Sequence, residues 1–309
     1  MKKLTRSQQD TISRVMGLKG RDIDMCMINA MDEYMPKEML LDCLTLYINK
    51  DGGYGHGLYI DNYNINSSVY QVYEAFRLLS MLDIDNIYDN ELYDYVVLKP
   101  LNYLFNRVAP IKNRWNPNVK TNDDFAHSEE FSFTEENKNK FGYHPTVAIV
   151  GYTLNLCKKE KVYYKKALEM AKKIIADFKE MESLTRYEMI SFNSFLNSIK
   201  KANLFPLEWD YMESKLIKLA LNMVSVDFND PASIRPMEVA FYLSDPKLDE
   251  YKEMELDYII DSLKSYGLWD HKKDWGYKKY AEEDSAMLKW VGAESVNNYF
   301  ILKKYGRME

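Results

Sequence analysis

The sequence predicts an all-α protein of about twelve helices. Apolar residues recur at helical spacing along most of the 309 residues. No two alternating runs are joined by a tight hairpin turn, so strand signals are scarce. About a dozen helices suit six helical hairpins closed into a ring, with apolar inner helices and amphipathic outer ones. Because no stretch reads as an interdomain linker, residues 1–309 are expected to form a single domain.

Each helix is expected where apolar residues follow the 3.6-residue period. Segment 145–157 is apolar nearly all round, with Pro145 in its first turn, and should be buried on most sides. Segment 161–179 is amphipathic, with its lysines on the solvated face. The expected helical ranges are 7–16, 21–34, 37–48, 66–82, 89–107, 145–157, 161–179, 185–201, 207–224, 234–243, 250–265 and 283–304.

Residues 109–144 have no helical period. Loops longer than about 12–15 residues are usually functional or disordered. This segment carries too many aromatic side chains for plain disorder. We therefore expect an ordered loop laid over one mouth of the ring.

Composition limits the partners and the compartment. A formal net charge of -6 argues against a nucleic-acid partner, because phosphate binding needs a basic face. The three cysteines lie in apolar helical contexts, which is typical of reduced thiols. Residues 1–17 lack the apolar core of a secretory signal, and the longest apolar run, 147–154, is too short to span a bilayer. A cytoplasmic protein without a membrane span is expected.

The densest local signal is Asp-Gly-Gly-Tyr-Gly-His-Gly at residues 51–57. It holds four of the 12 glycines and one of the four histidines. Glycines at this density let the backbone take positive φ and approach other groups closely. Asp51 is expected to accept backbone N–H groups. The run therefore predicts one particular turn between two helices.

Together with Asp61 and Asn66-Ser67-Ser68, this run resembles the helix-to-helix turn of the terpenoid cyclase and protein prenyltransferase toroids. It is most similar to a bacterial branch that carries DGGFGHxLxxD…SS. His144-Pro145-Thr146 at the start of an apolar helix, and the last helix from Trp290 to Arg307, are similar to the same branch. The resemblance implies an (α/α)6 barrel with a central cavity entered at one end.

The resemblance does not bring a catalytic motif with it. Segment 22–25 lacks the last acid of the DxDD motif of class II cyclases, and segment 123–127 does not complete the DDxxD motif of class I enzymes. No cysteine matches the zinc site of the protein prenyltransferases. No cofactor is therefore expected. A zinc site from His56, His127 and a carboxylate, or a magnesium site, would lack a recognised ligand spacing.

The four histidines lie in loops or at helix starts, and an imidazole pKa near 6.5 suits proton transfer at neutral pH. If the turns gather at one mouth, His56, Asp61 and His127 are candidates for acid/base catalysis. The alternative is that these histidines cap helices or bond loop carbonyls. The residues expected to bind substrate are Tyr54, Trp115, Asp124, His144, Trp269, Asp270 and Trp275.

Three functions remain open, and the first two place a small molecule in the central cavity. One is acid/base chemistry on a small, largely apolar substrate such as an isoprenoid. Another is a carbohydrate-active lyase or hydrolase, with carboxylates from the 123–130 loop and from Asp61 or Asp270. The third is a non-catalytic binding or scaffold protein. A deep apolar cavity with one polar end favours the first, an acidic cleft flanked by tryptophans the second, and a filled centre the third.

Overall fold

The computed structural model describes residues 1–84, 87–271 and 280–309. Over these residues the chain forms twelve α-helices and no β-strand, which confirms the predicted all-helical class. The predicted helix 234–243 contains only one helical turn, α10. In chain order the helices are α1 (Arg6–Lys19), α2 (Asp22–Met31), α3 (Met39–Thr45), α4 (Val69–Leu82), α5 (Lys99–Asn102), α6 (Thr146–Leu156), α7 (Val162–Glu180), α8 (Arg186–Lys201), α9 (Trp209–Met223), α10 (Pro236–Val239), α11 (Pro246–Ser262) and α12 (Glu283–Lys304).

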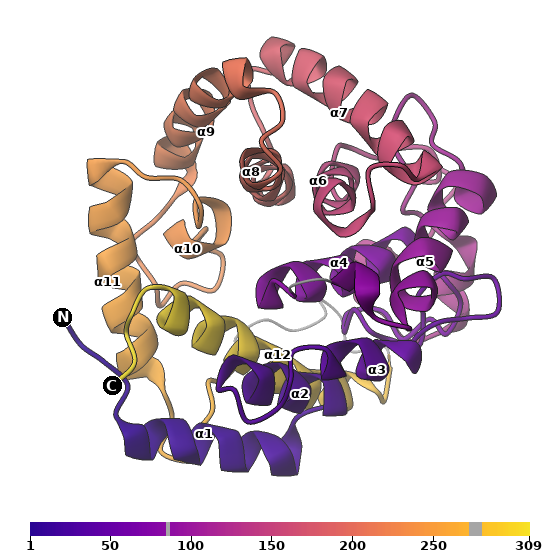
Figure 1. Cartoon of the computed structure of the whole chain (residues 1–309). Helices are drawn as coiled ribbons and strands as arrows, with labels where there is room; N and C mark the ends of the chain where they lie inside the picture. Colours follow the sequence, from indigo (N-terminus) through magenta and orange to yellow (C-terminus); the bar gives the residue numbers. More distant parts are fainter. Residues whose placement is uncertain (85–86, 272–279) are drawn as a thin grey trace.

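Figure 1 shows the helices in two layers around a common centre. Helices α2, α4, α6, α8, α10 and α12 lie inside, and α1, α7, α9 and α11 lie outside. Within the inner layer α12 packs on α2, α2 on α4, α4 on α6, α6 on α8 and α8 on α10. Outer helices pack on inner neighbours in sequence, as α7 does on α6, α9 on α8 and α11 on α10. From α6 to α12 the chain therefore alternates between the two layers.

The burial of α6 and α7 follows their sequence patterns. Ten of the 11 residues of α6 are buried, as its nearly uniform apolar character predicts. Helix α7 buries one face only, and its lysines lie on the other, which confirms the predicted amphipathic helix. Hydrophobic burial thus stabilises an inner helix on all sides and an outer helix on one. In the part of the chain that the structure describes, no helix is long and apolar enough to cross a membrane.

The glycine-rich run forms a tight turn between α3 and α4, and Asp51 organises it. The Asp51 carboxylate oxygen Oδ1 accepts a hydrogen bond from the Gly53 N–H at 3.0 Å and one from the Ser67 hydroxyl at 2.6 Å. The predicted role of Asp51 is thereby confirmed. Gly55 lies so close to the carbonyl oxygen of Ile65 that a Cβ atom would come within 2.3 Å of that oxygen. The turn consequently requires glycine at this position.

The segment 109–144 is an ordered loop with two short 3-10 turns. Trp115 anchors it, because its fully buried indole donates to the carbonyl oxygen of Leu104 at 2.8 Å. The backbone N–H of Trp115 donates to Thr146 Oγ1 at the start of α6, at 2.9 Å. These contacts hold the loop against the helices, although the loop contains no α-helix or β-strand within the described residues.

The two ends of the chain lie close together (Figure 1) and are joined by a buried arginine. Arg307 Nη1 donates to Asp257 Oδ1 of α11 at 2.7 Å and to the carbonyl oxygen of Lys2 at 2.9 Å. Its Nη2 donates to Glu253, one turn earlier on α11. The C-terminus is thus fastened both to the outer layer and to the N-terminus.

Replacing Gly55 by alanine is expected to destabilise the fold. The added Cβ would collide with a backbone oxygen, and overpacking of this kind costs about 1–3 kcal/mol. Urea unfolding followed by circular dichroism measures the effect.

Gly17→Ala is the matched control. Gly17 lies in α1, and an added Cβ would meet only the Met25 sulfur, at an ordinary 3.7 Å. Alanine there should raise the unfolding free energy by up to about 1 kcal/mol through helix propensity. Equal stability of wild type and Gly55→Ala would contradict the steric argument.

Candidate functional site

A cavity of about 630 Å³ lies between the inner helices. Its wall includes side chains of α4, α6, α8, α10 and α12 and one residue of α11. The connecting segments add residues 59–61, 128–130 and 270–271. Residues 129, 130 and 270 are exposed, so the cavity meets solvent there. The 109–144 loop therefore contributes to the mouth of the cavity through residues 128–130.

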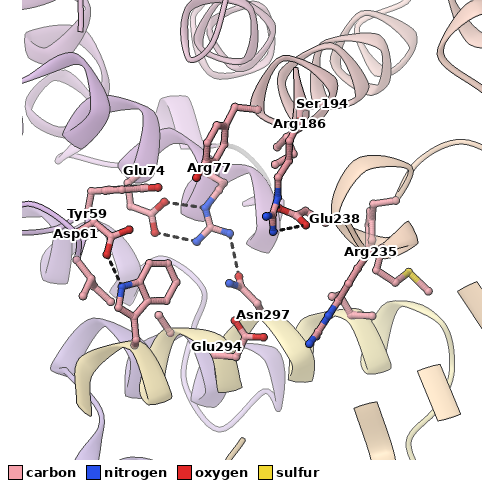
Figure 2. Close-up of a pocket in the computed structure, with 18 of the residues that line it drawn as sticks. Tyr59, Asp61, Glu74, Arg77, Arg186, Ser194, Arg235, Glu238, Glu294 and Asn297 are labelled. Atoms are coloured by element: carbon pink, nitrogen blue, oxygen red, sulfur yellow. Dashed lines mark hydrogen bonds and ion pairs between the residues drawn. The ribbon is translucent and has the colours of Figure 1, made fainter. Parts of the chain in front are cut away.

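Arg77 of α4 is held in the cavity by a fixed ion pair (Figure 2). Its Nε and Nη2 donate to the two carboxylate oxygens of Glu74, one turn earlier, each at 2.8 Å. Its Nη1 donates to Asn297 Oδ1 of α12 at 3.0 Å. Burial alone would lower the pKa of Arg77, but the charge and hydrogen bonds of Glu74 outweigh burial and raise it. The bidentate pair with Glu74 fixes the guanidinium plane, and the hydrogen bond to Asn297 connects α4 to α12.

Two further arginines enter the cavity and differ in their partners. Arg186 of α8 makes a bidentate pair with Glu238 of α10, Nε to Oε1 at 2.5 Å and Nη2 to Oε2 at 2.7 Å. Arg235 immediately precedes α10, and its guanidinium carbon lies 5.5 Å from the centre of the Tyr258 ring. Within the described residues no hydrogen bond or ion pair holds the Arg235 guanidinium. Figure 2 shows both arginines reaching into the cavity.

Glu255 of α11 is a carboxyl group of the cavity wall with a strongly raised pKa. It is 2% exposed, and burial raises its pKa to about 8. The Met237 N–H, which donates to Glu255 Oε2 at 2.7 Å, and the charge of Arg235 act in the opposite direction, whereas the charges of Glu238 and Glu294 raise the pKa further. A carboxyl group of this kind is mostly protonated at neutral pH and can donate a proton.

Asp61 lies in the cavity wall beside an aromatic platform. The indole N–H of Trp290 in α12 donates to Asp61 Oδ1 at 2.6 Å (Figure 2). The ring of His271 stacks on Trp290, with centroids 4.5 Å apart and planes 10° from parallel. The hydrogen bond fixes the carboxylate, and the stacked rings leave little freedom to the indole.

Tyrosine side chains form much of the remaining wall. Burial raises the pKa of each of them, so their hydroxyl groups stay protonated at neutral pH and can both donate and accept hydrogen bonds. They come from several elements, and the cavity-lining tyrosines are Tyr59, Tyr73, Tyr152, Tyr187 and Tyr242.

His144 lines the cavity as a neutral imidazole. Burial lowers its pKa to about 3. Its Nδ1 lies 2.7 Å from the hydroxyl oxygen of Ser191, and its ring contacts Tyr73 edge-on and stacks on Tyr187. His144 therefore cannot supply a proton as imidazolium near neutral pH, but it can position its aromatic neighbours.

No protein-family model, curated protein or solved structure matches this chain. The chemistry of the cavity consequently rests on its own side chains. Three of the residues predicted from the sequence line it, namely Asp61, His144 and Asp270.

The predicted acid/base group of His56, Asp61 and His127 is not assembled in the cavity. His56 is exposed, with Nε2 2.9 Å from Asn49 Oδ1, and does not line the wall. His127 is buried outside the wall, with Nδ1 2.7 Å from the carbonyl oxygen of Phe125. These contacts match the alternative interpretation of the two histidines as loop residues.

Most of the predicted substrate-binding residues also lie away from the cavity. Tyr54, Trp115 and Trp269 are buried and each donates a hydrogen bond to a backbone carbonyl oxygen. Asp124 is exposed and does not line the wall. Trp275 lies outside the described residues.

The sequence alone did not identify the charged residues of the inner helices as site residues. Glu74 and Arg77 stand three positions apart in a helix that is otherwise largely apolar, and this pattern could have indicated a buried pair. Arg235 and Glu255 carry no comparable pattern. In the part of the chain that the structure describes, no group of three or more His, Cys, Asp or Glu side chains could hold a metal ion.

Replacing His144 by glutamine is expected to flatten the acid side of the stability profile. The folded-state pKa near 3 lies below the ordinary value of 6.5, so below pH 6.5 the unfolded chain binds more protons than the folded one. The wild type should therefore lose about 1.4 kcal/mol per pH unit from this group as pH falls from 6.5 toward 3.

Urea titrations between pH 7 and pH 4 measure this slope for the wild type and the variant. His56→Gln removes an exposed imidazole and controls for the loss of a histidine as such. If both variants change the slope alike, burial of His144 is not the cause.

Proposed function

We propose that the chain is a carbohydrate-active hydrolase that cleaves a glycosidic bond in the central cavity. The observation that carries the proposal is a protonated carboxylic acid in the same cavity as a second glutamate. Glu255 is mostly protonated below a pKa of about 8, and Glu294 projects into the same cavity from α12 (Figure 2). Glycosidases require one carboxylic acid and one carboxylate across the scissile bond.

We also propose that the two helical layers form a closed (α/α)6 toroid. The unbroken series of inner contacts from α12 through α2, α4, α6 and α8 to α10 supports this arrangement. The contacts of Arg307 with α11 and with Lys2 support it from the ends of the chain. Fold does not determine function, so the chemistry is argued from the cavity alone.

The polar wall favours a sugar over an isoprenoid. Arg77, Glu74, Arg186 and Glu238 would all lose hydration against an apolar substrate, at several kcal/mol per ion. A sugar presents hydroxyl groups that replace the hydrogen bonds of displaced water. A cavity of about 630 Å³ also argues against a scaffold protein whose centre is filled by its own side chains.

Two buried oxygens of cavity-lining residues support a hydroxyl-rich ligand. Asn193 Oδ1 and Ser128 Oγ make no hydrogen bond within the described residues, and the two residues are 2% and 7% exposed. An unpaired buried polar atom costs about 1–3 kcal/mol. A ligand hydroxyl that reaches either side chain would recover that cost.

In the proposed reaction Glu255 donates its proton to the glycosidic oxygen as the bond from that oxygen to the anomeric carbon breaks. A water oxygen forms the new bond to the anomeric carbon. The Glu294 carboxylate accepts the proton that this water loses. Glu294 lies near enough to Glu255 for its charge to act on the pKa of Glu255.

Glu255→Gln and Glu294→Gln are each expected to lower kcat/KM by about 10²–10⁴-fold. The wild-type kcat/KM should fall as pH rises through about 8, where Glu255 loses its proton. Release of nitrophenol or of reducing sugar from a panel of 4-nitrophenyl glycosides and oligosaccharides measures turnover.

Glu250→Gln is the matched control, because Glu250 lies on the same helix, is exposed and pairs with Lys247 at the surface. It should retain wild-type kcat/KM. Thermal melts of all three variants separate loss of chemistry from loss of fold. A wild type that cleaves no member of the panel would overturn the proposal.

A further inference from the structure

Arg235 is the cavity arginine whose guanidinium makes no hydrogen bond or ion pair within the described residues. Arg77 and Arg186 each have a bidentate glutamate, whereas the contact of the Arg235 guanidinium within the described residues is the face of Tyr258. The side chain is half-buried and reaches into the cavity toward α12 (Figure 2).

A half-buried guanidinium without a hydrogen-bond acceptor is costly, because its N–H groups have lost water and gained no direct partner. The guanidinium carbon lies 5.5 Å from the centre of the Tyr258 ring, a cation–π contact that leaves its five N–H donors for another group. A planar anion with two oxygens matches this donor set, as arginine–carboxylate pairs show throughout proteins.

Two glutamates near Arg235 leave its N–H groups available to an anion. Glu238 is occupied by Arg186 through both of its oxygens, and the Arg186 Nη1 makes no hydrogen bond within the described residues. Glu255 is mostly neutral below its pKa of about 8 and competes little for Arg235. The opposite side of the cavity carries Asp61, so a second anionic group would be repelled there.

We propose that Arg235 is a specificity residue that binds an anionic oxygen group on the sugar, with Arg186 Nη1 as a second donor. The inference rests on the proposed function for the sugar, but the anion site follows from the arginines themselves. The shared chemistry is that of a carboxylate, as in a uronic acid, or of a phosphate or sulfate ester.

Isothermal titration calorimetry of the full-length protein tests the proposal with four probes: D-glucose, D-glucuronate, D-glucose 6-phosphate and D-glucose 6-sulfate. At least one anionic probe should bind about 10–100-fold more tightly than glucose, and which one does so identifies the anionic group. Arg235→Met should remove that preference, and Arg235→Lys should retain part of it, because lysine keeps the charge and loses the fork. Arg14→Met, which removes an exposed arginine of α1, is the control and should keep the preference.

The outcomes separate this inference from the proposed hydrolase. Arg235-dependent binding of an anionic probe without glycoside cleavage supports the anion site and contradicts the hydrolase. Cleavage of anionic glycosides with a kcat/KM that Arg235→Met leaves unchanged overturns the anion site alone. Equal affinities of the wild type for glucose and for all three anionic probes also overturn the anion site. The anion site is overturned as well if Arg235→Met keeps the preference for an anionic probe and Arg14→Met behaves like the wild type.

Discussion

Ion pairs fixed on the inner helices are the constraint on which the centre of the molecule depends. On α4, Arg77 forms a bidentate ion pair with Glu74, and it also donates a hydrogen bond to Asn297 of α12. Arg186 of α8 forms a bidentate ion pair with Glu238 of α10. Apolar side chains at these positions would gain by collapsing together. Charged groups instead resist full dehydration, because burying each ion costs several kcal/mol, which only a well-placed partner repays. The inner layer is therefore apolar where it meets other helices and charged where it faces the cavity.

The same constraint creates unlike carboxyl groups within one wall. Glu74 and Glu238 each have a guanidinium within hydrogen-bond distance, whereas Glu255 lies on α11, behind the inner layer, and its hydrogen bond comes from the Met237 N–H. Burial raises the pKa of Glu255 to about 8 for this reason. A difference in environment between acids of one type is what assigns donor and acceptor roles in acid/base enzymes. The proposed roles of Glu255 as proton donor and Glu294 as proton acceptor rest on the positions of the two residues rather than on residue type.

The sequence predicted the helices better than the site, and the reason is the range of the interactions. Helices α6 and α7 follow from local periodicity, and the turn at Asp51 follows from its own glycines, so these elements were predictable. The predicted range of α10 was too long, because a short apolar run does not determine where a helix ends. The role of Arg77 was only partly predictable: a pair of opposite charges three positions apart in an otherwise apolar helix indicates a buried pair, but it does not show that the pair faces a cavity. The position of His56 was not predictable either. His56 lies in the glycine-rich turn with a φ of 58° and does not line the cavity.

The toroid expected from the sequence and the proposed sugar chemistry would be compatible, because a fold leaves the chemistry to the residues that face its cavity. An isoprenoid in this cavity would cover Arg77, Arg186 and Arg235 with hydrocarbon and give none of their N–H groups an acceptor. A sugar offers hydroxyl oxygens to the same donors and hydroxyl protons to the carboxylates. The two paired arginines already have their counter-charges and can act as neutral hydrogen-bonding surfaces. The Arg235 guanidinium makes no hydrogen bond or ion pair within the described residues, so an anionic group on a substrate could bind it, and a purely apolar ligand lacks such a group.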